Sequence, residues 1–255
     1  QNLDFLTRVP IVEIYTRIEK ILELYTMAKD VDAILLTENG KYLGVLNSRT
    51  LIQIFNEKQL NEARDQNPLS KLPGNMIIHE YLMEVLNTSN GDTLLVYFDF
   101  NNFKPFNDTY GFRQGDRVIL LFADLLREGA VLNRWFVGHI GGDDFFLGAS
   151  CHQPQEIEGH LSKVRSLMDK FAEDVKAFYL KKDQDRGSIV AKDRNGRWKR
   201  FPLLTVSACA ICVKQNKEEE GLFSIDSISE RIALLKAEAK KNRTGLVVDP
   251  SCREE

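Results

Sequence analysis

From residue 67 onward, helical and strand patterns alternate in an order that constrains the fold more than any other feature of the chain. Some segments carry apolar residues at helical spacing, and the others are short apolar runs typical of strands. The expected elements are a helix over residues 76–87, a strand over 92–100, a helix from 116, a hairpin over 134–150, a helix over 157–178, a hairpin over 188–201 that runs straight into a strand over 203–213, and a helix over 225–241. This order predicts an α+β fold, ferredoxin-like or palm-type, in which helices flank a central antiparallel sheet. The basic hairpin over 188–201 is interpreted as an exposed turn, with a regulatory contact as the alternative.

Proline and glycine residues set the expected limits of the helix after the first strand. Pro105, Gly111 and Gly115 predict that no regular helix begins before Asp116, because proline lacks a backbone donor and glycine favours loops. Gly129 is expected to end this helix, since glycine is common just after a helix C-terminus.

The first 64 residues are expected to form a small unit of their own, followed by a larger domain over residues 65–255. The expected elements are a helix over 11–30, two strands around an Asn-Gly turn over 32–47, and a polar helix over 49–65. This order resembles one CBS repeat, a regulatory module that works in pairs. Asn47 and Thr50 replace the hydroxyl and the acid of that family's ribose motif. We therefore prefer a packing or dimerisation module to adenosine binding.

Composition limits the partners of the chain. The formal net charge of −3 provides no general attraction to nucleic acid or anionic lipid, so metal ions or a few basic residues must bind any phosphate. No apolar run approaches the ~18 residues of a membrane span, and no signal peptide is evident. Because the chain begins at Gln1, we expect a cytoplasmic piece of a longer protein, with a further sensor or output domain possible.

Two of the four cysteines form a CxxC pattern that would suit a redox or zinc centre. Cys209 and Cys212 lie in an apolar, β-branched run, and an offset of three along a strand points side chains to opposite faces. The pattern therefore favours buried structural thiols in a reducing compartment.

Two glycines and two aspartates, residues 141–144, occupy the tip of the predicted hairpin. The two faces of the strand over 92–100 are predicted to carry Leu95, Tyr97 and Asp99 on one side and Val96, Phe98 and Phe100 on the other. Asp99 and Asp143 are expected to lie side by side, which suits Mg²⁺, a cation held by carboxylates and substrate phosphates. Glycine at the tip lets a triphosphate approach without a Cβ in the way. The alternative is a surface turn.

Two motifs together resemble the GGDEF domain of diguanylate cyclases: FDFNNFKPFNDTYGFRQGD over residues 98–116 and GGDDF over 141–145. The matching positions are Asp99, Phe103, Lys104, Asn107, Asp108, Gly111, Gly115, Asp116 and Gly141 to Phe145. The resemblance covers roughly residues 65–248. The motifs of other phosphate-binding sites and of zinc proteases (GxxxxGK[ST], GxGxxG and HExxH) are absent from the sequence.

The resemblance implies an enzyme that joins two GTP molecules into cyclic di-GMP, with one GTP on each subunit of a homodimer. It implies that Asp99, Asp143 and the Phe100 carbonyl bind two Mg²⁺ or Mn²⁺ ions, and that Asp143 also assists deprotonation of the ribose 3′-hydroxyl. Asp144 is the remaining acidic candidate for a catalytic role.

The same resemblance implies the nucleotide-binding residues. Asn107 and Asp116 are the expected guanine contacts, because an amide and a carboxylate suit the donors of the guanine edge. The other expected contacts to the nucleotide are Gly141, Gly142, Phe103, Lys104, Lys236 and Lys240. The two lysines are four residues apart and so on one helix face, for which a solvated surface is the alternative.

The chain departs from the family pattern at several positions. Asp144 replaces the commoner Glu, and His139 stands where an Arg usually precedes the motif. Residues 67–75 lack an Asp–Arg pair that usually ties the start of the domain to its core. The window of the product-inhibition motif RxxD reads LNRW over residues 132–135, so we expect no feedback binding there.

Two hypotheses from different classes remain. The first is an active diguanylate cyclase, a nucleotidyltransferase, and the retained metal and guanine residues favour it. The second is a catalytically weak or inactive domain that binds GTP or relays a signal. A polymerase-like palm acting on nucleic acid would share the metal site but conflicts with the acidic charge balance.

Overall fold

The computed structural model describes residues 9–16, 18–27, 33–87, 91–193, 195–214, 224–242 and 244–252. Its internal contacts divide the chain into two compact units, Gln1–Arg64 (unit 1) and Asp65–Glu255 (unit 2). Each unit has its own sheet, and unit 2 also has a separate two-stranded ribbon.

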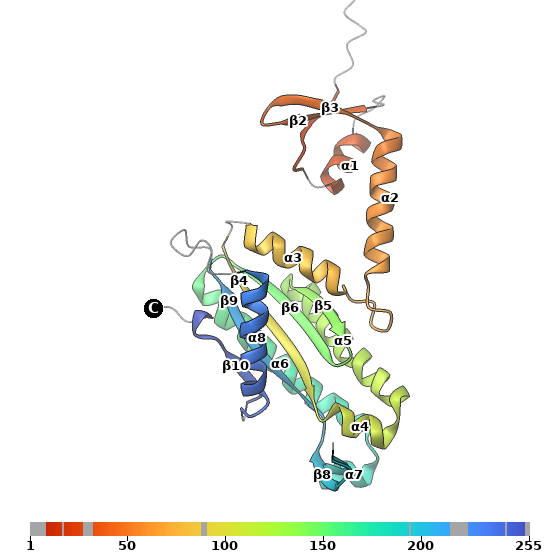
Figure 1. The fold of residues 1–255 in the computed structure, drawn as a ribbon, viewed down its shortest axis with the longest axis vertical. Helices are drawn as coiled ribbons and strands as arrows, with labels where there is room; N and C mark the ends of the chain where they lie inside the picture. Colours follow the sequence, from red (N-terminus) through yellow and green to blue (C-terminus); the bar gives the residue numbers. More distant parts are fainter. Residues whose placement is uncertain are drawn as a thin grey trace, which may run out of the picture. The chain divides into compact units, whose positions relative to one another are not determined.

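Unit 1 is a three-stranded sheet with two helices (Figure 1). Its elements are β1 (Ile11–Glu13), α1 (Ile18–Met27), β2 (Ala33–Glu38), β3 (Lys41–Asn47) and α2 (Ser48–Arg64). The predicted hairpin and second helix are confirmed, but the first helix is wrong at its start, where β1 pairs in parallel with β2. The Glu13 carboxylate accepts hydrogen bonds from the Asn39 and Gly40 amides, which ties β1 to the hairpin turn. Residues 17 and 28–30 of the predicted helix lie outside the described residues, and the CBS resemblance stays a prediction.

The main sheet of unit 2 has five strands in the order β10-β9-β4-β6-β5. They are β4 (Asp92–Asn101), β5 (Phe136–Gly141), β6 (Asp144–Cys151), β9 (Thr205–Val213) and β10 (Leu246–Val248). All neighbours are antiparallel except β9 and β10, which are parallel. The predicted central antiparallel sheet is therefore confirmed. Strand β10 was not predicted, because it is too short to show a strand pattern in the sequence.

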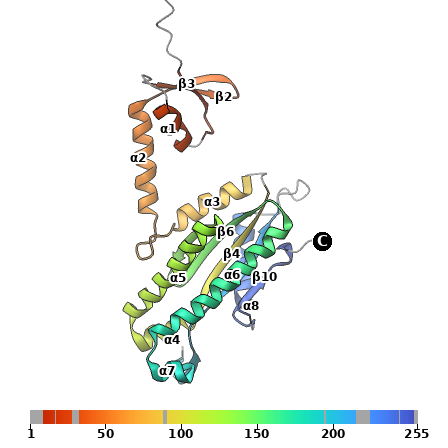
Figure 2. The same ribbon diagram turned by 180° about the vertical axis from the view of Figure 1, so that it is seen from behind.

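Helices cover both faces of this sheet (Figures 1 and 2). The described helical elements of unit 2 are α3 (Asn75–Asn87), α4 (Phe103–Tyr110), α5 (Phe112–Asn133), α6 (Pro154–Asp174), which continues into η1 (Val175–Phe178), α7 (Lys181–Arg186), α8 (Ile225–Ala239) and η3 (Pro250–Cys252). Of these, α7 lies away from the sheet, beside the two-stranded ribbon (Figures 1 and 2). Phe98 and Phe100 belong to the large core under α5 and α6, whereas Leu95 packs with α3 and α8. The predicted faces of this strand are confirmed, and Asp99 is on the α8 side.

The expected helix start at Asp116 is wrong, because two helices, α4 and α5, precede or include it. Pro105 is tolerated since it lies in the first turn of α4, where its missing N–H is not needed. Gly111, with φ of 85°, separates the two helices. Gly115 lies in α5, where an added Cβ would stand 1.9 Å from the Asn107 side-chain oxygen, so glycine permits close packing of α4 on α5.

Gly129 does not end α5, which continues to Asn133. A Cβ at Gly129 would lie 2.7 Å from the Trp135 ring, whereas a Cβ at Gly159 in α6 would meet no described atom within 4 Å. We expect Gly129→Ala to destabilise unit 2, since overpacking costs about 1–3 kcal/mol and outweighs the better helix propensity. Gly159→Ala, the matched control, should stabilise it by about 0.5–1 kcal/mol.

Urea unfolding of both variants measures this difference. A Gly129→Ala protein at least as stable as the wild type would mean that the Trp135 ring moves aside without cost.

The predicted hairpin over residues 188–201 is a separate ribbon, β7 (Ser188–Lys192) and β8 (Trp198–Pro202). As predicted, it runs almost directly into the next strand, since β9 begins at Thr205, but β8 and β9 belong to different sheets. Helix α7, which precedes the ribbon, is fastened to α4 by a hydrogen bond of 2.6 Å from the Tyr110 hydroxyl to Asp183. A regulatory role of the ribbon stays a prediction.

Cys209 and Cys212 are both buried and free, as predicted. Cys212 lies in the core under α5 and α6, whereas the Cys209 thiol points to the Ile232 carbonyl of α8. Burial raises the pKa of Cys209 to about 12, so it stays a thiol at neutral pH. Among the described helices, none combines the length and the apolarity that a bilayer crossing needs.

Candidate functional site

The sheet brings the predicted carboxylates to one edge. Asp99 near the end of β4 is directly opposite Asp144, the first residue of β6. Asp143 precedes it in the hairpin tip, beside Gly141 and Gly142, which both have positive φ. No described atom lies within 4 Å of the position that a Cβ would take at either glycine. The tip is therefore open on the side where a ligand would approach.

One lysine on helix α8 contacts three side chains of the site. The Lys236 ammonium lies 2.6 Å from Asp99 Oδ2 and 3.0 Å from Asp144 Oδ1. It also donates to the Tyr97 hydroxyl at 2.9 Å. Burial lowers the pKa of Lys236, but its hydrogen bonds to Asp99 and Tyr97 outweigh this and the net pKa lies above the ordinary value. Lys236 therefore stays positively charged at neutral pH, in the centre of the site.

Lys240, one turn later, contacts the other oxygen of the same carboxylate. Its ammonium lies 2.5 Å from Asp99 Oδ1, as an ion pair without hydrogen-bond geometry, because this oxygen accepts no hydrogen bond from the described residues. Asp99 is only 5% exposed, and a buried carboxylate needs such compensating charge. Both lysines thus pair with this buried carboxylate, while Lys240 itself remains exposed.

The second predicted metal ligand is electrostatically coupled to the first. Burial raises the pKa of Asp143, and the Asp99 carboxylate raises it further, whereas Lys240 lowers it. Two such carboxylates fit a hard divalent cation, which would replace their repulsion by attraction. The described residues contain no group of three or more His, Cys, Asp or Glu able to hold a metal ion. Ligand phosphates would therefore have to complete the coordination.

The raised pKa of Asp143 has a consequence for stability. Because the pKa is higher in the folded than in the unfolded state, the folded protein loses stability as the pH rises through it. We expect Asp143→Asn to be more stable than the wild type near pH 7 without metal, and the difference to vanish as the pH falls below the unfolded value of about 3.9. Thermal unfolding across this range measures it, with Asp108→Asn at an exposed site as the control. A difference independent of pH would contradict the expectation.

The predicted guanine contacts lie on α4 and at the start of α5. Asn107 Oδ1 is buried and has no hydrogen-bond partner among the described residues, while Asp116 is exposed. Lys104 is exposed on α4, and Phe103 packs edge-on against Phe100 with ring centroids 5.4 Å apart. An acceptor without a partner is costly unless a ligand donates to it.

A cavity of about 620 Å³ lies next to Lys240, and its lining does not include Asp99 or the hairpin tip. The ends of β4 and α8 contribute Phe100, Asn101, Asn102 and Lys240, and further walls come from α6 and the start of β9. The charged side chains of this lining are the Lys240 ammonium and the Asp169 carboxylate, beside the amides of Asn101, Asn102 and Asn242.

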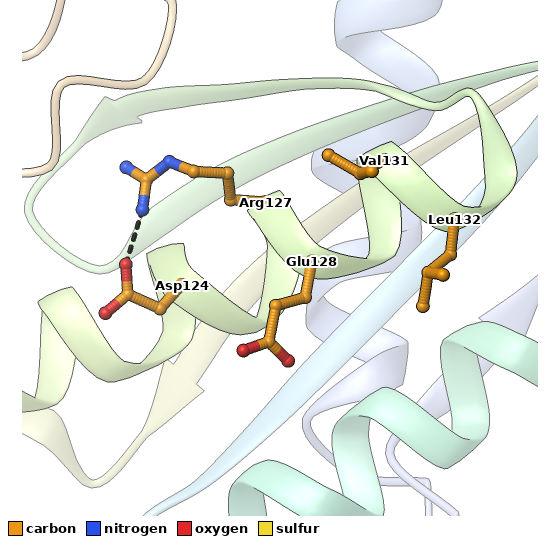
Figure 3. A pocket seen from close by; sticks show the side chains of 5 residues that line it. All are labelled: Asp124, Arg127, Glu128, Val131 and Leu132. Atoms are coloured by element: carbon orange, nitrogen blue, oxygen red, sulfur yellow. Dashed lines mark hydrogen bonds and ion pairs between the residues drawn. The ribbon is translucent and has the colours of Figure 1, made fainter.

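A second hollow, of about 630 Å³, lies on the surface of α5 (Figure 3). It is lined by Asp124, Arg127, Glu128, Val131 and Leu132, and Arg127 pairs with Asp124. Arg127 is the one basic residue of this lining, and the expected lack of product binding near residues 132–135 stays a prediction.

Sequence reasoning missed two residues of the site. Tyr97 lies on the same strand face as Asp99, two residues earlier, and this alternation was a usable signal. His139 is 2% exposed and bonds both the tip and residue 70, and nothing local indicated these partners.

Comparisons with known proteins agree on one family. The family model described as "Diguanylate cyclase, GGDEF domain" matches residues 64–189. The diguanylate cyclase DgcP of Pseudomonas aeruginosa is 32% identical over 83 residues, 31% of this chain and 12% of that protein. The diguanylate cyclase DgcN of Escherichia coli is 29% identical over 132 residues, 51% of this chain and 30% of that protein. The chain thus spans a third or less of the curated relatives it matches.

Solved structures share the fold. The coiled coil and GGDEF domain of DgcB from Caulobacter crescentus, in complex with c-di-GMP, has a TM-score of 0.56 at 19% identity and covers 79% of this chain and 95% of its own. The diguanylate cyclase SiaD of Pseudomonas aeruginosa, in complex with its activator SiaC, has a TM-score of 0.54 at 20% identity and covers 91% and 74%.

Proposed function

Because residues 64–189 match the model of the GGDEF domain, we propose that this protein is a diguanylate cyclase that condenses two GTP molecules into cyclic di-GMP. In each half of the reaction, the 3′-oxygen of one GTP attacks the α-phosphorus of the other. A new P–O bond forms, the bond between the α-phosphorus and the bridging oxygen to the β-phosphate breaks, and pyrophosphate leaves. Cyclic di-GMP signalling in the cytoplasm is the context that this activity implies.

One observation carries the proposal. Asp99 and Asp143 lie together at the sheet edge, with Lys236 and Lys240 directed at the same point and an open glycine tip beside them. Carboxylates for metal, cations for phosphate and room for a triphosphate are the components that phosphoryl transfer needs.

The roles of the residues follow from their chemistry. Asp99, Asp143 and the Phe100 carbonyl would hold two Mg²⁺ or Mn²⁺ ions, which when bound neutralise phosphate charge and activate the attacking oxygen. Asp143 assists removal of the 3′-hydroxyl proton, and its raised pKa suits a proton acceptor. Lys236 and Lys240 bind phosphate oxygens, because both ammonium groups already lie at the Asp99 carboxylate.

Base selection rests on α4 and α5. Asn107 Oδ1 is a buried acceptor without a partner, and the N1–H and N2–H₂ groups of guanine would satisfy it. Asp116 offers a second acceptor. Adenine has no donors at these positions, so we propose a preference for GTP over ATP.

Each chain holds one GTP, and two chains meet to complete the reaction, so we propose a homodimer as the active species. Unit 1 is the candidate for a regulatory or dimerisation module.

A second function is favoured by the ion pairs of Asp99. Its two oxygens contact Lys236 and Lys240, and this arrangement opposes metal binding unless phosphates draw the lysines away. With the short Asp144 side chain at the tip, the domain would then bind GTP and relay a signal without turnover.

Incubation with GTP and Mg²⁺, followed by chromatographic separation of the nucleotides, tests both functions. The wild type should form cyclic di-GMP, Asp143→Ala should not, and Asp185→Ala, at an exposed site on α7, should match the wild type. If the wild type forms no cyclic di-GMP at concentrations that allow dimerisation, the proposal that the protein is a diguanylate cyclase is overturned. Binding of GTP without turnover would support the second function.

A further inference from the structure

His139 on β5 is a buried histidine whose two ring nitrogens both have partners. Its Nε2 lies 3.0 Å from the Gly142 carbonyl oxygen in the hairpin tip. Its Nδ1 lies 2.8 Å from the hydroxyl of Ser70, which is itself 2% exposed. The imidazole is stacked on Phe145, with centroids 4.1 Å apart and planes 11° apart, which fixes the plane of the ring.

The partners determine which nitrogen carries the proton. A carbonyl oxygen only accepts, so Nε2–H must donate to Gly142. In the neutral ring Nδ1 then accepts, and the Ser70 hydroxyl donates to it. Ser70 Oγ also accepts a hydrogen bond of 3.3 Å from the Leu72 amide. The hydroxyl therefore accepts from Leu72 and donates its proton to His139, and the two bonds do not compete. Burial lowers the pKa of His139, which agrees with a neutral ring.

The bond to Gly142 acts where the hairpin ladder is interrupted. The register of β5 with β6 shifts between His139 and Gly141, so the ladder is irregular directly before Gly141 pairs with Asp144 at the tip. Gly141 and Gly142 have no side chains that could pack. A side-chain bond to the Gly142 carbonyl therefore restrains the residue directly before Asp143.

Ser70 lies in a loop that is rigid by its own hydrogen bonds. The Asn67 side chain accepts the Leu69 and Ser70 amides at 3.0 and 3.1 Å. Arg127 of α5 donates to the Ser70 carbonyl at 2.8 Å, and the His139 amide donates to the Pro73 carbonyl at 2.8 Å. This loop, residues 67–73, is the first of unit 2 after α2.

We infer that His139 is a positioning residue for Asp143: Ser70 fixes its tautomer, and its Nε2–H holds the Gly142 carbonyl and hence the tip. Its part in catalysis rests on the function proposed above. The tip is thereby connected to the loop through which the chain enters unit 2. A shift of that loop would therefore change the position of the Asp143 carboxylate.

Two isosteric variants test the inference. The amide nitrogen of Gln can occupy the position of Nε2, whereas that of Asn occupies the position of Nδ1. In ligand-free protein, His139→Asn should therefore speed hydrogen exchange of the Gly142, Asp143 and Asp144 amides by roughly five- to tenfold, and His139→Gln should restore most of the protection. His79→Gln, at an exposed site on α3, should match the wild type.

With GTP and Mg²⁺, His139→Asn should lower kcat by about ten- to a hundredfold with a smaller change in KM, because a displaced ligand affects the reacting geometry most. His139→Gln should recover most of this loss. Ser70→Ala should change exchange and kcat in the same direction but less.

Equal exchange in His139→Asn and the wild type, or equally fast exchange in both isosteric variants, would overturn the inference. If His139→Asn does not fold, ¹⁵N NMR of the wild-type imidazole decides: a proton on Nδ1, or a charged ring near pH 7, contradicts it. A wild type that makes no cyclic di-GMP would refute the proposed function alone, since the exchange data decide the position of the tip independently.

Discussion

Asp99→Asn should lower cyclic di-GMP formation at least about a hundredfold while leaving the protein folded, an effect typical of losing one strong electrostatic contact at a reacting centre. Asp99 is the residue on which the site converges, since Lys236, Lys240 and the repulsion with Asp143 all involve its carboxylate. The amide keeps the shape but removes the charge that would bind a divalent cation. Turnover of GTP and binding of Mn²⁺ in the presence of GTP are the two measurements.

Asp92→Asn, at the opposite end of the same strand, is the matched control and should leave turnover unchanged. If Asp99→Asn kept more than about a tenth of the wild-type rate, a loss of only about 1.4 kcal/mol, the carboxylate would not be a metal ligand in catalysis. Loss of turnover with unchanged Mn²⁺ binding would assign Asp99 to holding the lysines instead.

Phe122→Ala should destabilise unit 2 by about 3–5 kcal/mol, the usual cost of removing a fully buried aromatic ring. Phe122 of α5 is fully buried, and its ring centroid lies 5.0 Å from those of both Phe145 and Phe171. Phe98 and Phe100 of β4 are also in contact with it, at 5.4 and 5.3 Å. Removing the ring thus also removes packing contacts of β4, the strand that carries Asp99. Turnover should therefore also become more sensitive to temperature.

Denaturant unfolding followed by tryptophan fluorescence measures this change, because Trp135 is buried in the same core. Phe112→Ala is the control on the same helix: Phe112 is 79% exposed, and its removal should change stability by no more than about 0.5 kcal/mol. Similar losses in both variants would mean that the aromatic cluster is not the centre of the core.

Periodicity was sufficient for most of the elements and poor for their limits. The faces of β4 follow from alternation, and the burial of Phe98 and Phe100 opposite Asp99 confirms them. The start of α5 and the role of Gly129 were predicted wrongly, since glycine was interpreted by its backbone preference alone. At Gly115 and Gly129 the cause is a side chain that occupies the space of the missing Cβ, and that side chain belongs to another segment.

The residues of the candidate site likewise fall into those that the sequence predicted and those that it did not. Asp99, Asp143 and the lysines were predicted from motifs and helical spacing, and the structure brings them together. The contacts of His139 with Ser70 and Gly142 were not, because residue 70 is distant in sequence and no pattern near either residue indicates the other.

Strand alternation and the order of the elements were enough to predict which residue types meet at the sheet edge, because they leave few alternatives for Asp99 and the glycine tip. The compensation of the charges became visible in the folded chain alone: which lysine contacts which carboxylate oxygen, and which buried group holds the tip. The reason is physical, since periodic patterns encode the burial of whole elements. A hydrogen bond or an ion pair depends instead on angstrom-scale distances between segments that are far apart along the chain.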